Sequence, residues 1–256
     1  WPNLIEWDVL NEPIHKGELS TSVNARLEDG IAAEVSWFQT AERLEPNAKM
    51  FINEYQMISN SRNRTIPPDL SAFKARINTI LARGGPIEGI GVQSRFFSDV
   101  PPQRIIDRLD YFSDLELPIV GTEFEIKGET ITEENIRVTM MERVLTQYFS
   151  HPSVTSIYVY TLFENSKVSS SGVPLERHLV DRSGSLNLRG KLWLFLTKKH
   201  WNTNITTQLD RHGRYNLTGF KGEYEARVFS EEGNYETIRF HLDDESHKTL
   251  VPLNDE

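Results

Sequence analysis

The first 165 residues alternate between short apolar runs and segments with helical periodicity. The runs comprise residues 4–10, 49–55, 87–93, 118–124 and 154–163. The helical segments are clearest at residues 70–81, 105–112 and 136–148, and a less regular one spans residues 25–44. Apolar runs with few polar breaks are typical of strands that are buried on both faces. The alternation therefore predicts an α/β fold, a parallel sheet covered by helices.

Two architectures fit this alternation, an open doubly wound sheet and a (β/α) barrel. A (β/α)8 barrel needs eight strands in about 250 residues, whereas five strands are visible here. A barrel would therefore lack about three strands before Trp1. The sequence opens with Trp-Pro-Asn, without an initiator Met, and leads directly into strand-like residues. We expect a fragment or a processed chain.

The pattern changes after Trp201. Short alternating or β-branched segments follow at residues 206–209, 214–220, 223–230, 235–242 and 248–253, with turn residues between them. Such spacing predicts a small antiparallel β-module. We therefore expect two domains, residues 1–200 with the strand–helix alternation and residues 201–256 as a β-rich extension.

Composition and motifs exclude several classes of protein. The net charge is −9 with no Lys/Arg cluster, which argues against a nucleic-acid partner. The longest uncharged run, residues 144–163, contains Gln147, His151 and Pro152, so we predict no membrane span. The chain has no cysteine and no zinc-type histidine spacing, and neither a metal nor an organic cofactor is predicted.

Two acidic residues occupy matching positions at the ends of apolar strands. Glu12 follows Asn11 at the end of the first strand, and Glu123 lies near the end of the fourth. Burying a carboxylate there costs free energy unless it is paired or used. Two carboxylates on one rim are what glycoside cleavage requires. Each glutamate also has a plainer interpretation, as a solvated rim residue or an ion-pair partner.

Four motifs, in order, resemble glycoside hydrolase family 10, the retaining endo-1,4-β-xylanases. The first is Trp-Asp-Val-Leu-Asn-Glu-Pro at residues 7–13. Residues 48–55, 87–94 and 117–126 resemble the fifth, sixth and seventh strands of that family. The resemblance covers roughly residues 1–200. It implies an N-terminally truncated (β/α)8 TIM barrel in which strands 4–8 are present, followed by the β-module.

The resemblance also implies roles for the two acids. Glu12 would be the general acid/base and Glu123 the nucleophile of a double displacement with retention, which needs carboxyl groups about 5–5.5 Å apart. Asn11 would hydrogen-bond the 2-hydroxyl of the sugar at the cleavage point. Gln93 and Tyr55 would line the cleft near the nucleophile.

Two departures from the family pattern concern the same site. Arg95 stands where the family usually has a histidine that is hydrogen-bonded to the nucleophile. An arginine could orient and stabilise that carboxylate and bind substrate with Asn11, Tyr55 and Gln93, while lowering its basicity. The eighth strand, residues 158–163, lacks the usual tryptophan.

We therefore expect a secreted, extracellular glycoside hydrolase that acts on xylan-type polysaccharide and is monomeric when full length, without metal or cofactor. Two alternatives remain open. One is a carbohydrate-binding relative with weakened or lost turnover, and the other is a related barrel glycosidase that acts on another β-glycan, such as β-glucan or mannan.

Overall fold

The structure, a computed structural model, describes residues 4–27, 29–60, 64–128, 130–165, 172, 175–230 and 233–243. The chain divides into two compact units, Trp1–Leu192 and Trp193–Glu256. The division lies close to the boundary expected at residue 200, which stays a prediction.

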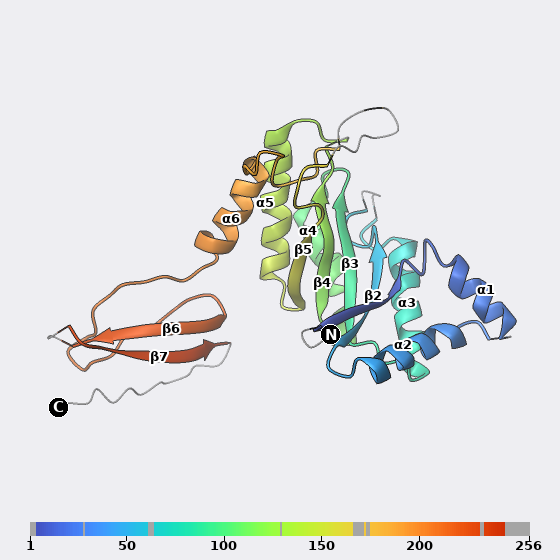
Figure 1. Cartoon of the computed structure of the whole chain (residues 1–256), viewed down its shortest axis with the longest axis horizontal. Helices are drawn as coiled ribbons and strands as arrows, with labels where there is room; N and C mark the ends of the chain where they lie inside the picture. Colours follow the sequence, from blue (N-terminus) through green and yellow to red (C-terminus); the bar gives the residue numbers. More distant parts are fainter. Residues whose placement is uncertain are drawn as a thin grey trace. The chain divides into compact units, whose positions relative to one another are not determined.

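The first unit contains a five-stranded parallel sheet whose order follows the chain, β1-β2-β3-β4-β5 (Figure 1). The strands are β1 (Glu6–Asn11), β2 (Lys49–Tyr55), β3 (Gly89–Phe96), β4 (Ile119–Ile126) and β5 (Val154–Val159). All five expected strands are present, with ends shifted by a few residues. A sequential order has no point at which the order reverses, so the doubly wound alternative is wrong and the arrangement is that of a barrel wall.

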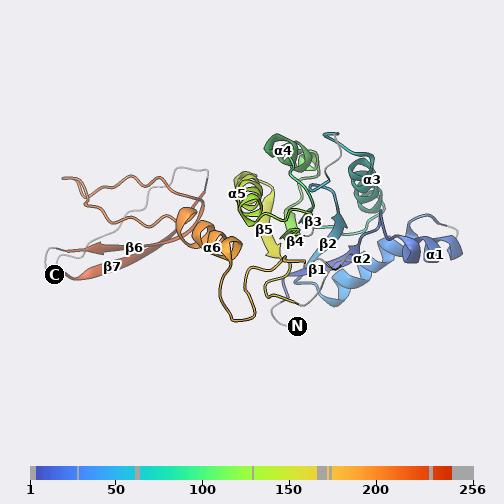
Figure 2. The same cartoon turned by 90° about the horizontal axis from the view of Figure 1, so that it is seen from above.

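Helices connect the strands and lie on one side of the sheet. They are α1 (Glu18–Arg26), α2 (Ala32–Leu44), α3 (Pro68–Ala82), α4 (Pro102–Asp110) and α5 (Glu134–Ser150), with a 3₁₀ turn at Ser113–Leu115. Figure 2 shows α3, α4 and α5 along the same side of the strands. Helix α2 packs on β1 and β2, and α5 packs on β4.

The helix expected across residues 25–44 is in fact two helices. Leu27 ends α1, and Asp29 interrupts the pattern by accepting a hydrogen bond from the Ile31 amide at 3.1 Å. The Asn24 side chain accepts the Ala33 amide at 2.8 Å, which satisfies a free donor at the start of α2. Local side-chain hydrogen bonding therefore overrides the apolar periodicity.

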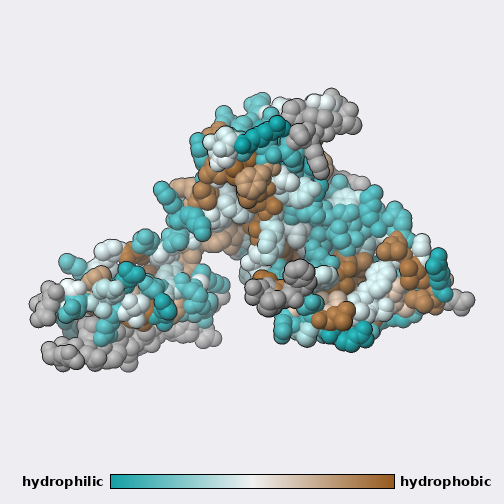
Figure 3. Space-filling model, in the orientation of Figure 1, coloured by the Kyte–Doolittle hydropathy of each residue, from teal (hydrophilic) through white to brown (hydrophobic). Residues whose placement is uncertain are grey.

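The core lies between the sheet and these helices. The central strands β2, β3 and β4 are almost wholly buried, and Phe38, Phe73 and Phe112 fill the helix layer at 0% exposure. The edge strands differ, because Trp7 of β1 is 44% exposed and Tyr158 of β5 is 47% exposed. Figure 3 shows apolar residues reaching the surface over α5 and in the region of β1 and α2.

The sheet is strongly curved. Strands β1 and β5 are its opposite edges, yet the Tyr158 hydroxyl on β5 donates to the Glu6 carboxylate on β1 at 3.1 Å. A flat sheet of five strands would separate these edges by about four interstrand spacings of 4.7–4.9 Å. The inner face is therefore concave, and the side chains of distant strands converge on it.

The second unit has less regular structure than the sequence predicts. Helix α6 (Leu188–Phe195) leads into it and continues as a π-helical turn at Leu196–His200; strands β6 (Gly222–Phe229) and β7 (Tyr235–Leu242) then pair as an antiparallel ribbon. The strands expected at residues 206–209 and 214–220 are wrong, although the turn between them forms. Most of these residues are exposed. Their alternation therefore does not correspond to a buried apolar face that would favour strand pairing. The strand expected at 248–253 lies outside the described residues.

Among the described helices, none combines the length and the apolar character needed to cross a membrane.

Arg108 of α4 provides a test of this fold. Its side chain is fully buried and donates to four backbone carbonyls, those of Ile58, Asn60, Arg64 and Thr65. Burial, together with the nearby Arg104, lowers the pKa of Arg108 to about 10, so the guanidinium remains charged at neutral pH. The substitution Arg108→Met leaves those carbonyls without their donor. We expect the free energy of unfolding to fall by about 3 kcal/mol in denaturant titrations.

Arg143→Met on α5 is the matched control. Arg143 pairs with Asp99, whose side chain is 59% exposed. Loss of an exposed pair changes stability by about 1 kcal/mol at most. Equal effects of the two substitutions would contradict the buried-anchor role of Arg108.

Candidate active site

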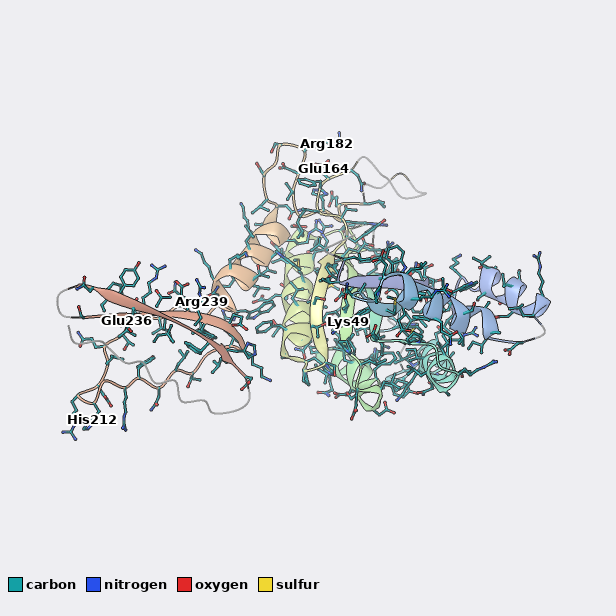
Figure 4. The ribbon with its side chains drawn as sticks, turned by 60° about the horizontal axis from the view of Figure 1, so that its bottom comes forward. Lys49, Glu164, Arg182, His212, Glu236 and Arg239 are labelled. Atoms are coloured by element: carbon teal, nitrogen blue, oxygen red, sulfur yellow. The ribbon has the colours of Figure 1, made fainter. Side chains whose placement is uncertain are left out.

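The candidate site lies at the carboxyl ends of the parallel strands, where ligands bind in such sheets. Figure 4 marks the two ends of the sheet: Lys49 begins β2, whereas Glu164 and Arg182 lie in the segment that follows β5. Glu164 and Arg182 form an ion pair at 3.2 Å. All six residues predicted from the sequence lie at or near the carboxyl ends of β1 to β4.

The two candidate carboxylates share an unusual backbone conformation. Glu12 has φ 57° and Glu123 has φ 49°, both in the left-handed region. Glu12 directly follows β1, and Glu123 lies at an irregularity in β4, where the register with β5 shifts between Gly121 and Phe124. This conformation costs a residue with a Cβ about 1 kcal/mol or more, and it persists only where surrounding contacts enforce it. Such conformations concentrate at functional sites.

A network of amide side chains joins the strands on the inner face. Asn53 of β2 donates to the Asn11 side chain at 2.9 Å and accepts from the Thr122 hydroxyl at 2.7 Å. Gln93 of β3 donates to Glu12 at 2.7 Å and to Asn11 at 3.5 Å. Because Asn53 and Gln93 are buried at 3% and 2% exposure, these hydrogen bonds fix their orientations.

Glycines on β3 leave room for this network. A Cβ on Gly91 would lie 2.4 Å from the Asn53 side-chain oxygen, and a Cβ on Gly89 would lie 2.2 Å from the Phe51 ring. The side chains of Phe51 and Asn53 on β2 therefore occupy the space beside Gly89 and Gly91 of β3, where β3 has no side chains. The absence of a side chain at Gly91 is thus a condition for the position of Asn53, and its absence at Gly89 is a condition for the position of Phe51.

Arg95 binds the second carboxylate. Its Nη2 donates to Glu123, its Nε lies 3.6 Å from Glu125, and its guanidinium lies 4.2 Å from the centre of the Tyr160 ring. Burial alone would lower the pKa of Arg95, but the carboxylates of Glu123 and Glu125 outweigh it and raise the pKa. Arg95 therefore carries a permanent positive charge beside Glu123.

Behind this pair lies a second buried acid. The Glu125 side chain has 0% exposure, and it is surrounded by cations: Arg177 lies 3.3 Å away and Lys127 3.7 Å away, in addition to Arg95. Arg177 comes from the segment between β5 and α6. The local charge around Glu123 is therefore set by several groups rather than by Arg95 alone.

Tyr55 and Gln93 lie on the side of Glu12. The Tyr55 ring lies 4.1 Å from the His15 ring, and burial followed by the charges of Glu54 and Glu12 raises the Tyr55 pKa. Gln93 bonds Glu12 directly. The sequence placed both residues near Glu123; their roles toward a substrate stay predictions.

Asp8 of β1 is close enough to Glu123 for their charges to interact. The residue is exposed to solvent, yet partial desolvation of its carboxyl group raises its pKa, and the charges of Glu6 and Glu123 raise it further. The described residues contain no group of three or more His, Asp or Glu side chains arranged for a metal ion.

Sequence analysis missed several members of this site. Asn53 and Glu54 end an apolar strand, as Asn11 and Glu12 do, so the same strand-end signal could have found them. Thr122 and Tyr160 lie within the segments 117–126 and 158–163, but nothing in the pattern distinguishes them from their neighbours. Nothing in the pattern around Arg177 indicates that it reaches Glu125.

The chain is similar to known proteins over most of its length. A profile described as Glycosyl hydrolase family 10 matches residues 2–178. Endo-1,4-beta-xylanase 1 of Arabidopsis thaliana is 26% identical over 248 residues, which cover 97% of this chain and 24% of that protein. Anti-sigma-I factor RsgI6 of Acetivibrio thermocellus is 29% identical over 222 residues, which cover 87% of this chain and 26% of that protein. The chain thus spans about a quarter of the length of these relatives.

Solved structures share the fold. Xylanase 10B from Thermotoga petrophila RKU-1, in complex with xylobiose, matches with a TM-score of 0.61 and 17% identity, over 76% of this chain and 60% of that chain. Native xylanase 10B from Thermotoga maritima matches with a TM-score of 0.60 and 18% identity, over 77% of this chain and 61% of that chain.

Gly91→Ala tests the packing that places Asn53. The added Cβ would displace the Asn53 side chain, so we expect the free energy of unfolding to fall by about 1–3 kcal/mol. Gly30→Ala is the control, because a Cβ there meets nothing within 4 Å, and a change within about 0.5 kcal/mol is expected. Chemical denaturation of both variants measures the difference, and a Gly91→Ala variant as stable as Gly30→Ala would refute the close approach.

Proposed function

The chain belongs to glycosyl hydrolase family 10, and on that premise we propose that its protein is a retaining endo-1,4-β-xylanase that cleaves internal linkages of xylan-type polysaccharide. The observation that carries the proposal is the pair Glu12 and Glu123. Glu12 directly follows β1 and Glu123 lies within β4 of the same parallel sheet; both have left-handed backbone, and both accept hydrogen bonds from inward-facing residues of β3.

We further propose that β1 to β5 are strands 4–8 of a (β/α)8 barrel. The order of the four sequence motifs supports this assignment, as do the sequential strand order and the concave sheet. The partial exposure of Trp7 and Tyr158 on the edge strands is consistent with a wall that continues on both sides.

The chemistry would proceed in two displacements. In the first, a Glu123 carboxylate oxygen attacks the anomeric carbon while Glu12, protonated, gives its proton to the departing glycosidic oxygen. In the second, Glu12 takes a proton from water, the water oxygen attacks the anomeric carbon, and the Glu123 carboxylate leaves. The sequence of steps needs no metal and no organic cofactor.

The other site residues would orient these two acids and the sugar. Gln93 fixes one oxygen of Glu12, and Arg95 fixes Glu123. Asn11, held by Asn53, would present its amide to the sugar 2-hydroxyl, a hydrogen bond that strengthens in the transition state. The Tyr160 ring covers the Arg95 guanidinium, and Tyr160 belongs to the segment in which the family usually has a tryptophan.

We extend the proposal to the setting of the protein from the family resemblance. It would act outside the cell on insoluble or soluble xylan, as a monomer when complete. Xylan is the expected partner, and no nucleic acid or membrane is involved.

Glutamine substitutions test the assignment in the complete protein. Glu123→Gln removes the attacking carboxylate and should reduce xylan hydrolysis to background, whereas Glu12→Gln should lower it by about 10²–10⁴-fold through loss of acid/base catalysis. Reducing-sugar release from xylan, β-glucan and mannan measures activity and preference, and NMR of the first product reports retention. Glu116→Gln is the control, because Glu116 is an exposed glutamate that also has positive φ. Unchanged activity in both site variants would end the assignment.

A carbohydrate-binding protein with little turnover is the second candidate. The ion pair of Arg95 and Glu123 favours it, because the pair stabilises the carboxylate that would attack. One relative is named an anti-sigma-I factor. Calorimetric binding of xylo-oligosaccharides without release of reducing ends would support this candidate, and Arg95→Met should then weaken binding. Release of reducing ends by the wild-type protein would exclude it.

A further inference from the structure

The turn that carries Glu12 is tightly folded. The Glu12 amide donates to the Asn53 carbonyl at 2.8 Å, and the Glu12 carbonyl accepts the Lys16 amide at 2.7 Å. A Cβ on Gly17 would lie 2.5 Å from the Pro13 carbonyl oxygen. The chain therefore doubles back within six residues of β1, and a small change in the turn would move the Glu12 carboxyl group.

Glu54 lies directly behind this turn. Its side chain has 0% exposure, on the opposite face of β2 from Asn53. Glu54 Oε2 accepts the Ile14 amide at 2.7 Å, and Oε1 accepts the Tyr55 amide at 2.8 Å and lies 2.9 Å from His15 Nδ1. Both carboxylate oxygens are thus used, and two of the three contacts go to the turn of Glu12.

His15 extends this contact to a helix. Its Nε2 lies 3.6 Å from Asp69 at the start of α3, and its ring lies against Tyr55. The turn is therefore attached to β2 through Glu54 and to α3 through Asp69. Two anchors on rigid elements can hold Glu12 in a backbone conformation that it would not adopt alone.

We propose that Glu54, with His15, is a positioning residue that fixes the turn of Glu12 and so the direction from which Glu12 delivers its proton. This inference rests on the function proposed above. Glu54 has no role in the two displacements; it acts through the backbone of Ile14. Its effect should therefore fall on reactions in which Glu12 must transfer a proton, and it should spare a first displacement whose leaving group departs without one.

Leaving-group dependence separates positioning from a general structural role. The dinitrophenolate group of a dinitrophenyl β-xylobioside departs without protonation. The phenolate group of a phenyl β-xylobioside requires the proton of Glu12 to depart. In the complete protein, Glu54→Gln offers one acceptor oxygen in place of two. We expect kcat/KM for the phenyl substrate to fall by roughly 10- to 100-fold, less than the 10²–10⁴-fold that complete loss of acid/base catalysis costs. The first-step rate for the dinitrophenyl substrate should change less than about threefold.

His15→Phe is the second variant, because it keeps a ring against Tyr55 and the His15 side chain is 19% exposed. We expect the same selective loss, smaller in size. Glu116→Gln is again the control. Equal losses on both substrates in Glu54→Gln and His15→Phe, or no loss on either, would overturn the proposal.

Amide hydrogen exchange gives a readout that is independent of activity. Exchange of the Ile14 amide should accelerate by at least about tenfold in Glu54→Gln, with thermal unfolding measured in parallel. If Glu12→Gln and Glu123→Gln leave catalysis unchanged, the proposed function fails while the exchange result still decides the anchoring of the turn. If those two variants lose activity and Glu54→Gln affects neither exchange nor the phenyl substrate, only the present inference fails.

Discussion

Alternate residues of one central strand connect the two candidate carboxylates. Gln93 and Arg95 of β3 point to the same inner face, and one donates to Glu12 while the other donates to Glu123. Glu12 and Glu123 are 111 positions apart along the chain. In the sheet, β2 and β3 lie between the strands that carry them. Asn53 adds a further connection on this face, because it bonds Asn11 on one side and Thr122 on the other.

Much of the fold follows from apolar patterning alone. The runs at residues 49–55 and 118–124 are strands because their residues are buried from both sides, and the strand-end positions of Glu12 and Glu123 follow from parallel pairing. The apolar pattern gave wrong predictions where the segment has no face that is buried in the structure. Residues 206–220 alternate, but most of their side chains are exposed, and Asp29 divides a helix through its own side chain.

The candidate site could be predicted only in part. Glu12, Glu123, Asn11, Gln93 and Arg95 lie on motifs that sequence analysis can recognise. The backbone conformation of the two glutamates, the burial of Glu54 and Glu125, and the reach of Arg177 depend on residues brought together from separate elements. A single sequence carries no signal for such contacts, because spacing along the chain does not determine them.

Arginine at position 95 has a consequence for how the site would respond to acidity. A histidine at this place would lose its proton near neutrality and leave the neighbouring carboxylate without a counter-charge. A guanidinium keeps its proton throughout the range in which proteins stay folded, and here its pKa is raised further. The positive charge beside Glu123 therefore does not vary with pH, whereas the donor beside Glu12 is the neutral amide of Gln93, so the two halves of the site are electrostatically unequal.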